Sequence, residues 1–152
     1  MNWKAITLSC FWLMIPILAW NGVFMEKLAH PAFQADENVP GWVLIFENIL
    51  RIGIMAWPLF LKMGSKTTLH RWGWVLYGVG LVLYFGSWFP LMNAPQSIWS
   101  NHLLGFTAPA TLPLLWLLGI GLIGGSWPYM ILSLLFVSVH AGHWVLAFRS
   151  IN

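Results

Sequence analysis

Two pairs of ionisable side chains lie in segments that are otherwise almost entirely apolar. Glu47 and Arg51 stand in IFENILRIG, between two hydrophobic runs, and His140 and His143 stand in SLLFVSVHAGHW. Carboxylate, guanidinium and imidazole groups can bind an ion or a polar head group, or transfer a proton. An ionised group costs about 3 kcal/mol near the centre of a membrane-spanning helix, so such groups normally face protein or an aqueous cavity. These four residues are therefore where we look first for function.

The first pair has the spacing of neighbours on a helix. Glu47 and Arg51 are four residues apart, which places them on one face, with the acid first in the favourable order. One interpretation is an ion pair that clamps two helices together. The other is a ligand, proton or substrate site, in which Arg51 holds an anionic head group or fixes Glu47 as a carboxylate. Asn48, the next residue, is predicted to support this site with its amide.

The histidines allow three interpretations. His140 and His143 are three apart and share a helix face, so hydrogen-bonded packing against Glu47 or a carbonyl is the simplest. A pair that handles protons or binds a ligand is the second, because imidazole titrates near physiological pH. A metal or haem site is the third, with a further metal ligand from Glu47 or His102, or an axial haem ligand from another helix. The sequence defines no metal centre and leaves the cofactor open, with His140, His143 and His102 as candidate ligands.

Composition determines the solvent in which these groups work. The chain has 152 residues, of which 59% are hydrophobic and 7% charged, and its mean hydropathy is +0.75. Soluble domains carry about 25% charged residues, so we predict an integral membrane protein with the lipid bilayer as its surroundings. The net charge of +3 is scattered, which excludes a nucleic-acid surface. The single Cys10 excludes an internal disulfide and a cysteine-based zinc site.

Five segments are apolar over a length near the roughly 20 residues that a helix needs to cross a bilayer. We therefore predict an all-α polytopic membrane protein, one membrane domain over residues 1–152 built as a bundle of five transmembrane helices. Ser126 before Trp127-Pro128 predicts the start of the last helix. The short turn GGSWP predicts that the fourth and fifth helices are antiparallel neighbours. The predicted spans are residues 5–24, 41–61, 72–91, 107–124 and 127–147.

The basic residues of the loops predict an orientation, because cytoplasmic loops hold the excess of Lys and Arg. Four such residues fall on the side of the N-terminus and two on the other side. We expect a bacterial-type plasma (inner) membrane, with the N-terminus cytoplasmic and the C-terminus outside. The four are Lys4, Lys62, Lys66 and Arg71, and the two are Lys27 and Arg149.

Helix rise predicts which polar groups lie at the same depth. At 1.5 Å per residue, Glu47 lies about 9 Å and Arg51 about 15 Å below the outer boundary of the second span. His140 lies about 10 Å and His143 about 6 Å below the same boundary in the fifth span. We therefore expect one shared interior site built by these two helices.

A stripe of small and tyrosine residues marks one face of the third span. Gly73, Tyr77, Gly80, Tyr84 and Ser87 follow a spacing of four and three residues. Small residues let another helix approach closely, so a packing face is expected. The alternative is that Tyr84 lines the interior site.

No sequence motif of a familiar enzyme or nucleotide-binding class occurs in the chain. We therefore expect binding of a small or lipophilic ligand, or proton handling, in an intramembrane pocket open to the outer side. One alternative is an accessory or assembly subunit of a larger membrane complex. Another is a membrane enzyme acting on a lipid or isoprenoid, with Glu47 or His140 as acid–base; we lean to a non-enzymatic role. Other membrane subunits or a second copy of the chain are the expected protein partners.

Overall fold

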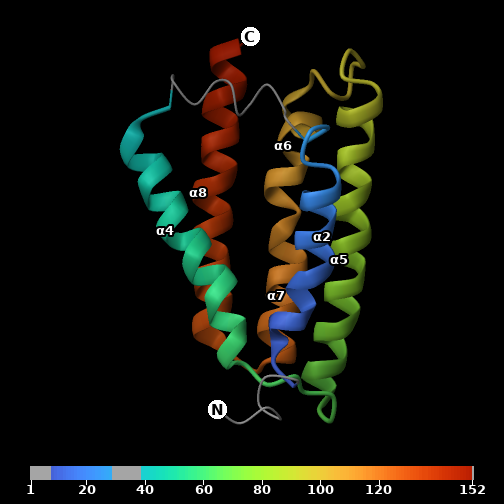
Figure 1. The fold of residues 1–152 in the computed structure, drawn as a ribbon, viewed down its shortest axis with the longest axis vertical. Coiled ribbons are helices and arrows are strands. Elements are labelled where there is room, and N and C mark those ends of the chain that lie inside the picture. The colour runs from blue at the N-terminus through green and yellow to red at the C-terminus, as the bar shows by residue number, and fades with distance from the viewer. Residues whose placement is uncertain (1–7, 29–38, 152) are drawn as a thin grey trace.

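The structure is a computed structural model that describes residues 8–28 and 39–151. These residues form an all-α bundle of five apolar helical segments (Figure 1), which confirms the predicted fold class. Four segments, residues 41–60, 68–93, 103–123 and 127–151, are long and apolar enough to cross a membrane. The first, Cys10–Val23, is apolar but shorter. Part of its predicted span, residues 5–7, lies outside the described residues.

Each segment follows an apolar run of the sequence, and two runs are divided by proline. The second segment is α4 (Gly41–Ala56), continued by the 3₁₀ turn η3 that Pro58 helps to form. The fourth is divided at Leu112, before Pro113, because proline has no N–H to donate to the preceding turn. The remaining elements are η1 (Cys10–Met14), α2 (Ile15–Val23), η3 (Trp57–Phe60), α5 (Thr68–Asn93), α6 (Leu103–Thr111), α7 (Pro113–Ile123) and α8 (Trp127–Ile151).

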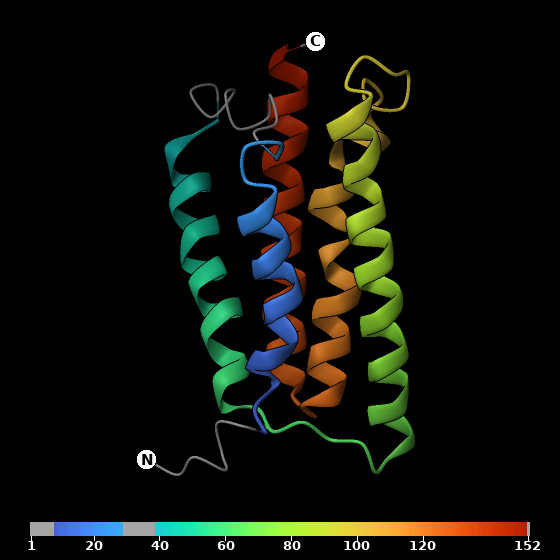
Figure 2. The same cartoon turned by 45° about the vertical axis from the view of Figure 1, so that its right-hand side comes forward.

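The glycine stripe of α5 is a packing seam against α7. A Cβ atom added to Gly80 would lie 2.5 Å from the backbone nitrogen of Trp116, and one added to Gly119 would lie 2.6 Å from that of Tyr77. Such distances are shorter than any real contact of a Cβ, so only glycine allows the two backbones to approach this closely. Figures 1 and 2 both show α5 running beside α6 and α7.

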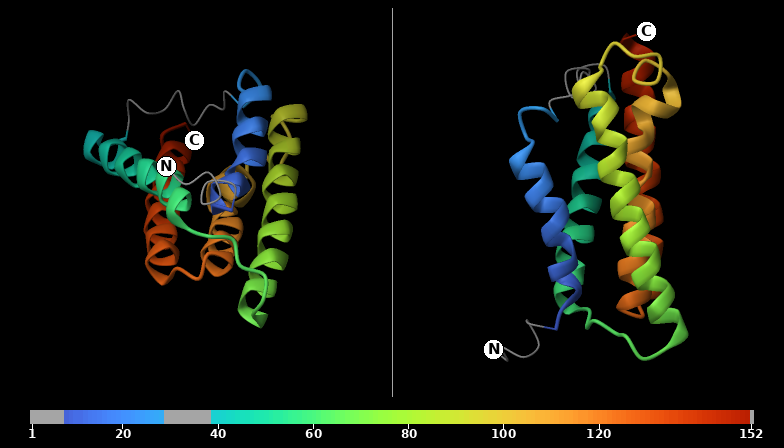
Figure 3. Two further views of the ribbon diagram at one scale, coloured as in Figure 1. Left: turned by 60° about the horizontal axis from the view of Figure 1, so that its bottom comes forward. Right: turned by 90° about the vertical axis from the view of Figure 1, so that its right-hand side faces the viewer.

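The last helix packs between α4 and the α6–α7 segment, beside α7 as the short turn predicts (Figure 3). The Ser126 hydroxyl accepts a hydrogen bond from the Tyr129 backbone N–H at 3.3 Å, which confirms the predicted helix start. The Tyr129 hydroxyl in turn donates to the carbonyl of Ile54 in α4 at 3.4 Å. The two helices that carry the predicted site are therefore direct neighbours.

The first segment is attached mainly at one end. The backbone N–H of Cys10 donates to the carbonyl of Leu61 at 2.7 Å, and the Tyr77 hydroxyl of α5 donates to the carbonyl of Leu13 at 2.7 Å. Further along α2, Trp20 stacks on Phe85 of α5 with ring centroids 4.6 Å apart. Toward the other end of the bundle, α4 leans away from α2 (Figure 1). A cavity lies in the interior between them.

Candidate functional site

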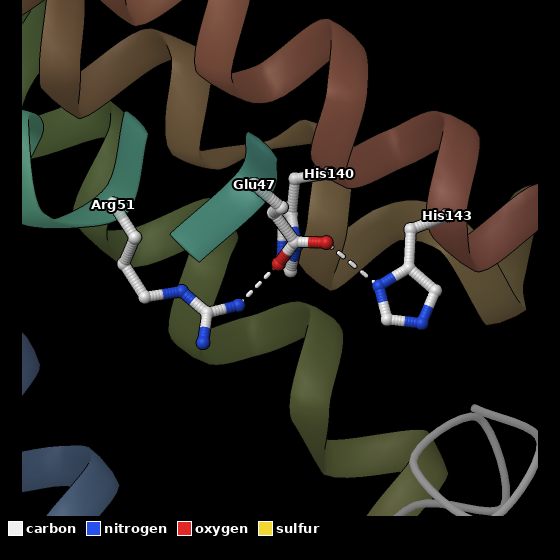
Figure 4. A network of polar contacts seen from close by, with 4 residues as sticks. All are labelled: Glu47, Arg51, His140 and His143. Carbon is white, nitrogen blue, oxygen red and sulfur yellow. Dashed lines mark hydrogen bonds and ion pairs between the residues drawn. The ribbon is translucent and has the colours of Figure 1, made fainter. Parts of the chain in front are cut away.

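A buried carboxylate is the centre of the polar cluster (Figure 4). Glu47 of α4 is 2% exposed, and one of its oxygens, Oε1, accepts hydrogen bonds from the Arg51 guanidinium and from His140 Nδ1 at 2.9 Å. The other oxygen, Oε2, is 2.7 Å from His143 Nδ1. Both histidines belong to α8. The structure therefore brings together the four residues that the sequence assigned to one shared interior site.

The hydrogen bonds to Glu47 determine which ring nitrogen of each imidazole carries a hydrogen. An ionised carboxylate only accepts hydrogen bonds, so each Nδ1 that bonds to Glu47 carries the hydrogen. His140 and His143 are then held with Nδ1–H toward the carboxylate, and Nε2 is their remaining ring nitrogen. The charge of Glu47 is balanced by that of Arg51, so the cluster carries no net charge when both imidazoles are neutral. Neutrality matters here because uncompensated charge in an apolar interior is costly.

The four side chains differ in what they face. Glu47 and His143 are enclosed, with side-chain exposures of 3% and 6%. The Arg51 side chain is 44% exposed and that of His140 is 14% exposed, and both line the interior cavity. The enclosed pair therefore supports the two groups that a bound molecule would touch.

The cavity has a volume of about 420 Å³ and is walled by α2, α4, α5, the α6–α7 segment and α8. Its polar lining consists of Arg51 and His140 together with Asn21 and Tyr84. The rest of the wall is apolar and largely aromatic, and includes Ile17, Ile54, Pro113, Trp116, Phe136 and Trp144.

Tyr84 is part of this wall and is 6% exposed. Its hydroxyl donates to Oδ1 of Asn21 at 3.3 Å rather than to the Glu47 cluster. Sequence reasoning overlooked Asn21, although it is the one amide in the apolar stretch 10–23 and could have been flagged on that ground. Both interpretations of the α5 stripe hold, because its glycines pack on α7 and its Tyr84 lines the cavity.

Two predicted residues are not brought to the site. Asn48 follows Glu47 and is rotated by about 100° around the helix, which turns it to the exposed face of α4 beside Ile45 and Ile52. His102 is exposed at the start of α6, where its Nδ1 accepts from the backbone N–H of Leu104 at 3.3 Å. Asn48 is thus not a ligand-contacting group in this arrangement, and His102 is a helix cap rather than a third metal ligand.

The donor atoms of Glu47, His140 and His143 lie within 4.8 Å of one another, and this set of ligands suits zinc or iron. However, Arg51 already neutralises the carboxylate. A divalent ion would bring two further positive charges beside the guanidinium, in surroundings of low polarity. The arrangement therefore favours the neutral hydrogen-bonded cluster over a metal centre.

Comparison with known proteins found no similar family model, no similar curated protein and no similar solved structure. The function must therefore be argued from the site.

Proposed function

We propose that the protein binds one small lipophilic molecule inside the membrane, in the cavity lined by Arg51 and His140. The observation that supports this most is the cavity itself, about 420 Å³ in volume, with an aromatic and apolar wall and a few polar groups. Binding sites for small molecules have this character, with volumes of roughly 300–1,000 Å³ and a small number of polar groups that set orientation.

The exposure of Arg51 favours ligand binding over a purely structural clamp. A clamp, or a subunit that only presents surfaces to partners, would have the ion pair fully enclosed. Glu47 is enclosed, but the Arg51 side chain is 44% exposed and lines the cavity. In our proposal Glu47 orients the guanidinium and holds His140 in one tautomer, while Arg51 and His140 contact the bound molecule.

We further propose the plasma membrane of a bacterial-type cell, with the N-terminal side cytoplasmic. Exposed apolar side chains such as Trp42 and Ile52, each 70% exposed, suit contact with lipid. Of the described basic residues, Lys62, Lys66 and Arg71 belong to one end of the bundle, and Lys27 and Arg149 to the other. The end with more basic residues is expected to be cytoplasmic.

Filling the cavity tests the proposal. Ile17 lines the cavity and is 2% exposed, whereas Leu18 is 42% exposed on the same helix. We expect native mass spectrometry of the wild type and of Leu18→Trp, released from lipid nanodiscs, to show a bound lipophilic molecule. In Ile17→Trp this species should fall by about tenfold or more, because the indole takes the space of the ligand.

Met55→Phe narrows the cavity from the α4 side and serves as a second variant if Ile17→Trp does not fold. The proposal is wrong if the wild type carries no bound molecule under native conditions. It is also wrong if a folded cavity-filling variant carries the same molecule at the same occupancy as Leu18→Trp.

A further inference from the structure

Polar groups occupy two opposite walls of the cavity. Arg51 and His140 belong to α4 and α8, whereas Asn21 and Tyr84 belong to α2 and α5. Figures 1 and 2 show α4 and α5 on opposite sides of the bundle. A molecule held between these walls therefore meets polar groups at two separate edges.

The backbone hydrogen bond between Cys10 and Leu61 is a common reference point from which the depth of the two polar walls can be compared. Asn21 follows Cys10 by eleven residues, and Arg51 precedes Leu61 by ten residues. With a rise of 1.5 Å per α-helical residue and about 2.0 Å per residue in the 3₁₀ segments η1 and η3, Asn21 and Arg51 lie about 18 Å and about 17 Å from this bond. The two polar walls thus face each other across the cavity rather than being stacked along it.

Both walls offer hydrogen-bond donors. The Arg51 guanidinium has five N–H groups, and its hydrogen bond to Glu47 involves a single nitrogen, Nη2. On the other wall the Tyr84 hydroxyl occupies Oδ1 of Asn21, so the Nδ2 group keeps two hydrogens for a bound molecule. His140 adds its Nε2, which accepts a hydrogen bond when the ring is neutral.

Flat aromatic side chains also line the cavity. Phe136 is stacked on the His140 ring at 5.4 Å with planes 9° apart. Trp116 lines the cavity, is 3% exposed, and its Nε1 has no hydrogen-bond partner among residues 8–28 and 39–151. A buried indole N–H without a partner is unfavourable, and an oxygen on a bound molecule would satisfy it. The space therefore suits a planar ring that carries oxygen acceptors.

We infer that the bound molecule is of the quinone class, a flat apolar ring with oxygen atoms at opposite edges; this rests on the proposed function. One oxygen accepts hydrogen bonds from Arg51, and the opposite oxygen accepts from Nδ2 of Asn21. In the quinol form, the hydroxyl near Arg51 donates to Nε2 of His140. A fatty acid or a sterol has a polar group at one end only, and would leave one of the two walls against hydrocarbon.

The test uses menadione, a quinone with two distinguishable carbonyls, and methylnaphthalene, which has the same ring without oxygen. We expect menadione to raise the melting temperature of the protein in detergent and to bind about tenfold more tightly than methylnaphthalene, because each hydrogen bond contributes to affinity. With carbon-13 placed at one carbonyl or the other, infrared difference spectra should show both carbonyl stretches lowered by hydrogen bonding.

The variants assign each oxygen to its wall. Asn21→Leu should return one carbonyl band to its frequency in detergent alone and weaken binding by about tenfold, and Arg51→Lys should shift the other band. Asn48→Leu is the matched control, because this amide lies on the exposed face of α4 and should change neither band. Asn21→Leu leaves the Glu47 cluster intact, so the test does not depend on the folding of the Arg51 variant.

The outcomes separate this inference from the proposed function. If methylnaphthalene or decanoate binds the wild type as tightly as menadione and Ile17→Trp abolishes it, a lipophilic site exists but the quinone inference is wrong. If menadione binds and neither carbonyl band responds to Asn21→Leu or Arg51→Lys, the two-wall assignment is overturned. If none of the three probes binds the wild type, the quinone inference is wrong, and native mass spectrometry of the wild type decides the proposed function separately.

Discussion

The two sides of this bundle are held together by opposite means. On one side, glycines bring the backbones of α5 and α7 together so closely that Gly80 has no room for a methyl group. On the other side, α4 meets α8 through long polar side chains, with the Glu47 carboxylate bonded to Arg51 and to two imidazoles. The cavity lies between the two sides.

This contrast shows why function is expected beside α4. Close backbone contact leaves no interior space and gains its stability from van der Waals packing. Hydrogen bonds between polar side chains are directional, and their donor groups can be shared with a ligand. The α5–α7 seam therefore provides a closely packed wall, and the α4–α8 contact provides the charged group and the imidazole of the cavity.

The largest effect is expected from breaking the polar contact. Glu47→Gln removes the negative charge that balances Arg51 and places an amide among three donors. We expect the free energy of unfolding to fall by about 3 kcal/mol, because two buried imidazoles lose the charged acceptor of their hydrogen bonds and the partly exposed Arg51 loses its counter-charge. Thermal unfolding in detergent measures the loss, and Asn48→Gln, on the exposed face of the same helix, is the control.

The double variant Glu47→Gln with Arg51→Met should recover part of this loss, because no unbalanced charge remains. If the double variant is as unstable as Glu47→Gln alone, the cost comes from the imidazole contacts instead. If Glu47→Gln has the same melting temperature as the wild type, the hydrogen bonds of Glu47 to His140 and His143 do not stabilise the contact between α4 and α8.

A smaller effect is expected from disturbing the glycine seam. Gly80→Ala places a methyl group 2.5 Å from the backbone nitrogen of Trp116, so α5 and α7 must move apart. We expect a loss of about 2 kcal/mol, typical of overpacking. Gly78→Ala is the matched control on the same helix, since nothing lies within 4 Å of the added atom. Equal melting temperatures for the two alanine variants would show that the seam is not closely packed.

The last prediction is that metal ions have no effect on the wild type. Addition of Co²⁺ or Zn²⁺ should leave the melting temperature of the wild type unchanged and produce no visible cobalt absorption, because the Arg51 charge opposes a cation at Glu47, His140 and His143. Arg51→Met removes this charge and is the comparison in which a metal-dependent shift would be reasonable. A stoichiometric cobalt spectrum from the wild type would show that the polar contact is a metal centre.

Several features of the site could be predicted from the sequence because they depend on one helix at a time. Glu47 and Arg51 share a face through helical periodicity, and helix rise places His140 at the level of Glu47. Asn48 shows the limit of this reasoning. Its position beside Glu47 suggested a shared role, but which way a helix face turns depends on the neighbouring helices, and the residue lies on the exposed face.

Most of the cavity wall could not be predicted, because it comes from five segments of the chain. Asn21, Trp116 and Phe136 reach one space only through the packing of α2, α7 and α8. His102 was a reasonable candidate ligand by residue type, yet local capping at the start of α6 determines its contact.

By itself, the amino-acid sequence determined that this is an all-α membrane protein, because apolar runs of this length are stable only as helices in lipid. It also determined which ionisable groups must face protein or an aqueous cavity within the membrane. Only the tertiary structure decided that both histidines bond to one carboxylate, that α5 packs on α7, and that Arg51 faces a cavity. These facts depend on how helices rotate and approach one another, which is set by contacts between side chains far apart in the chain.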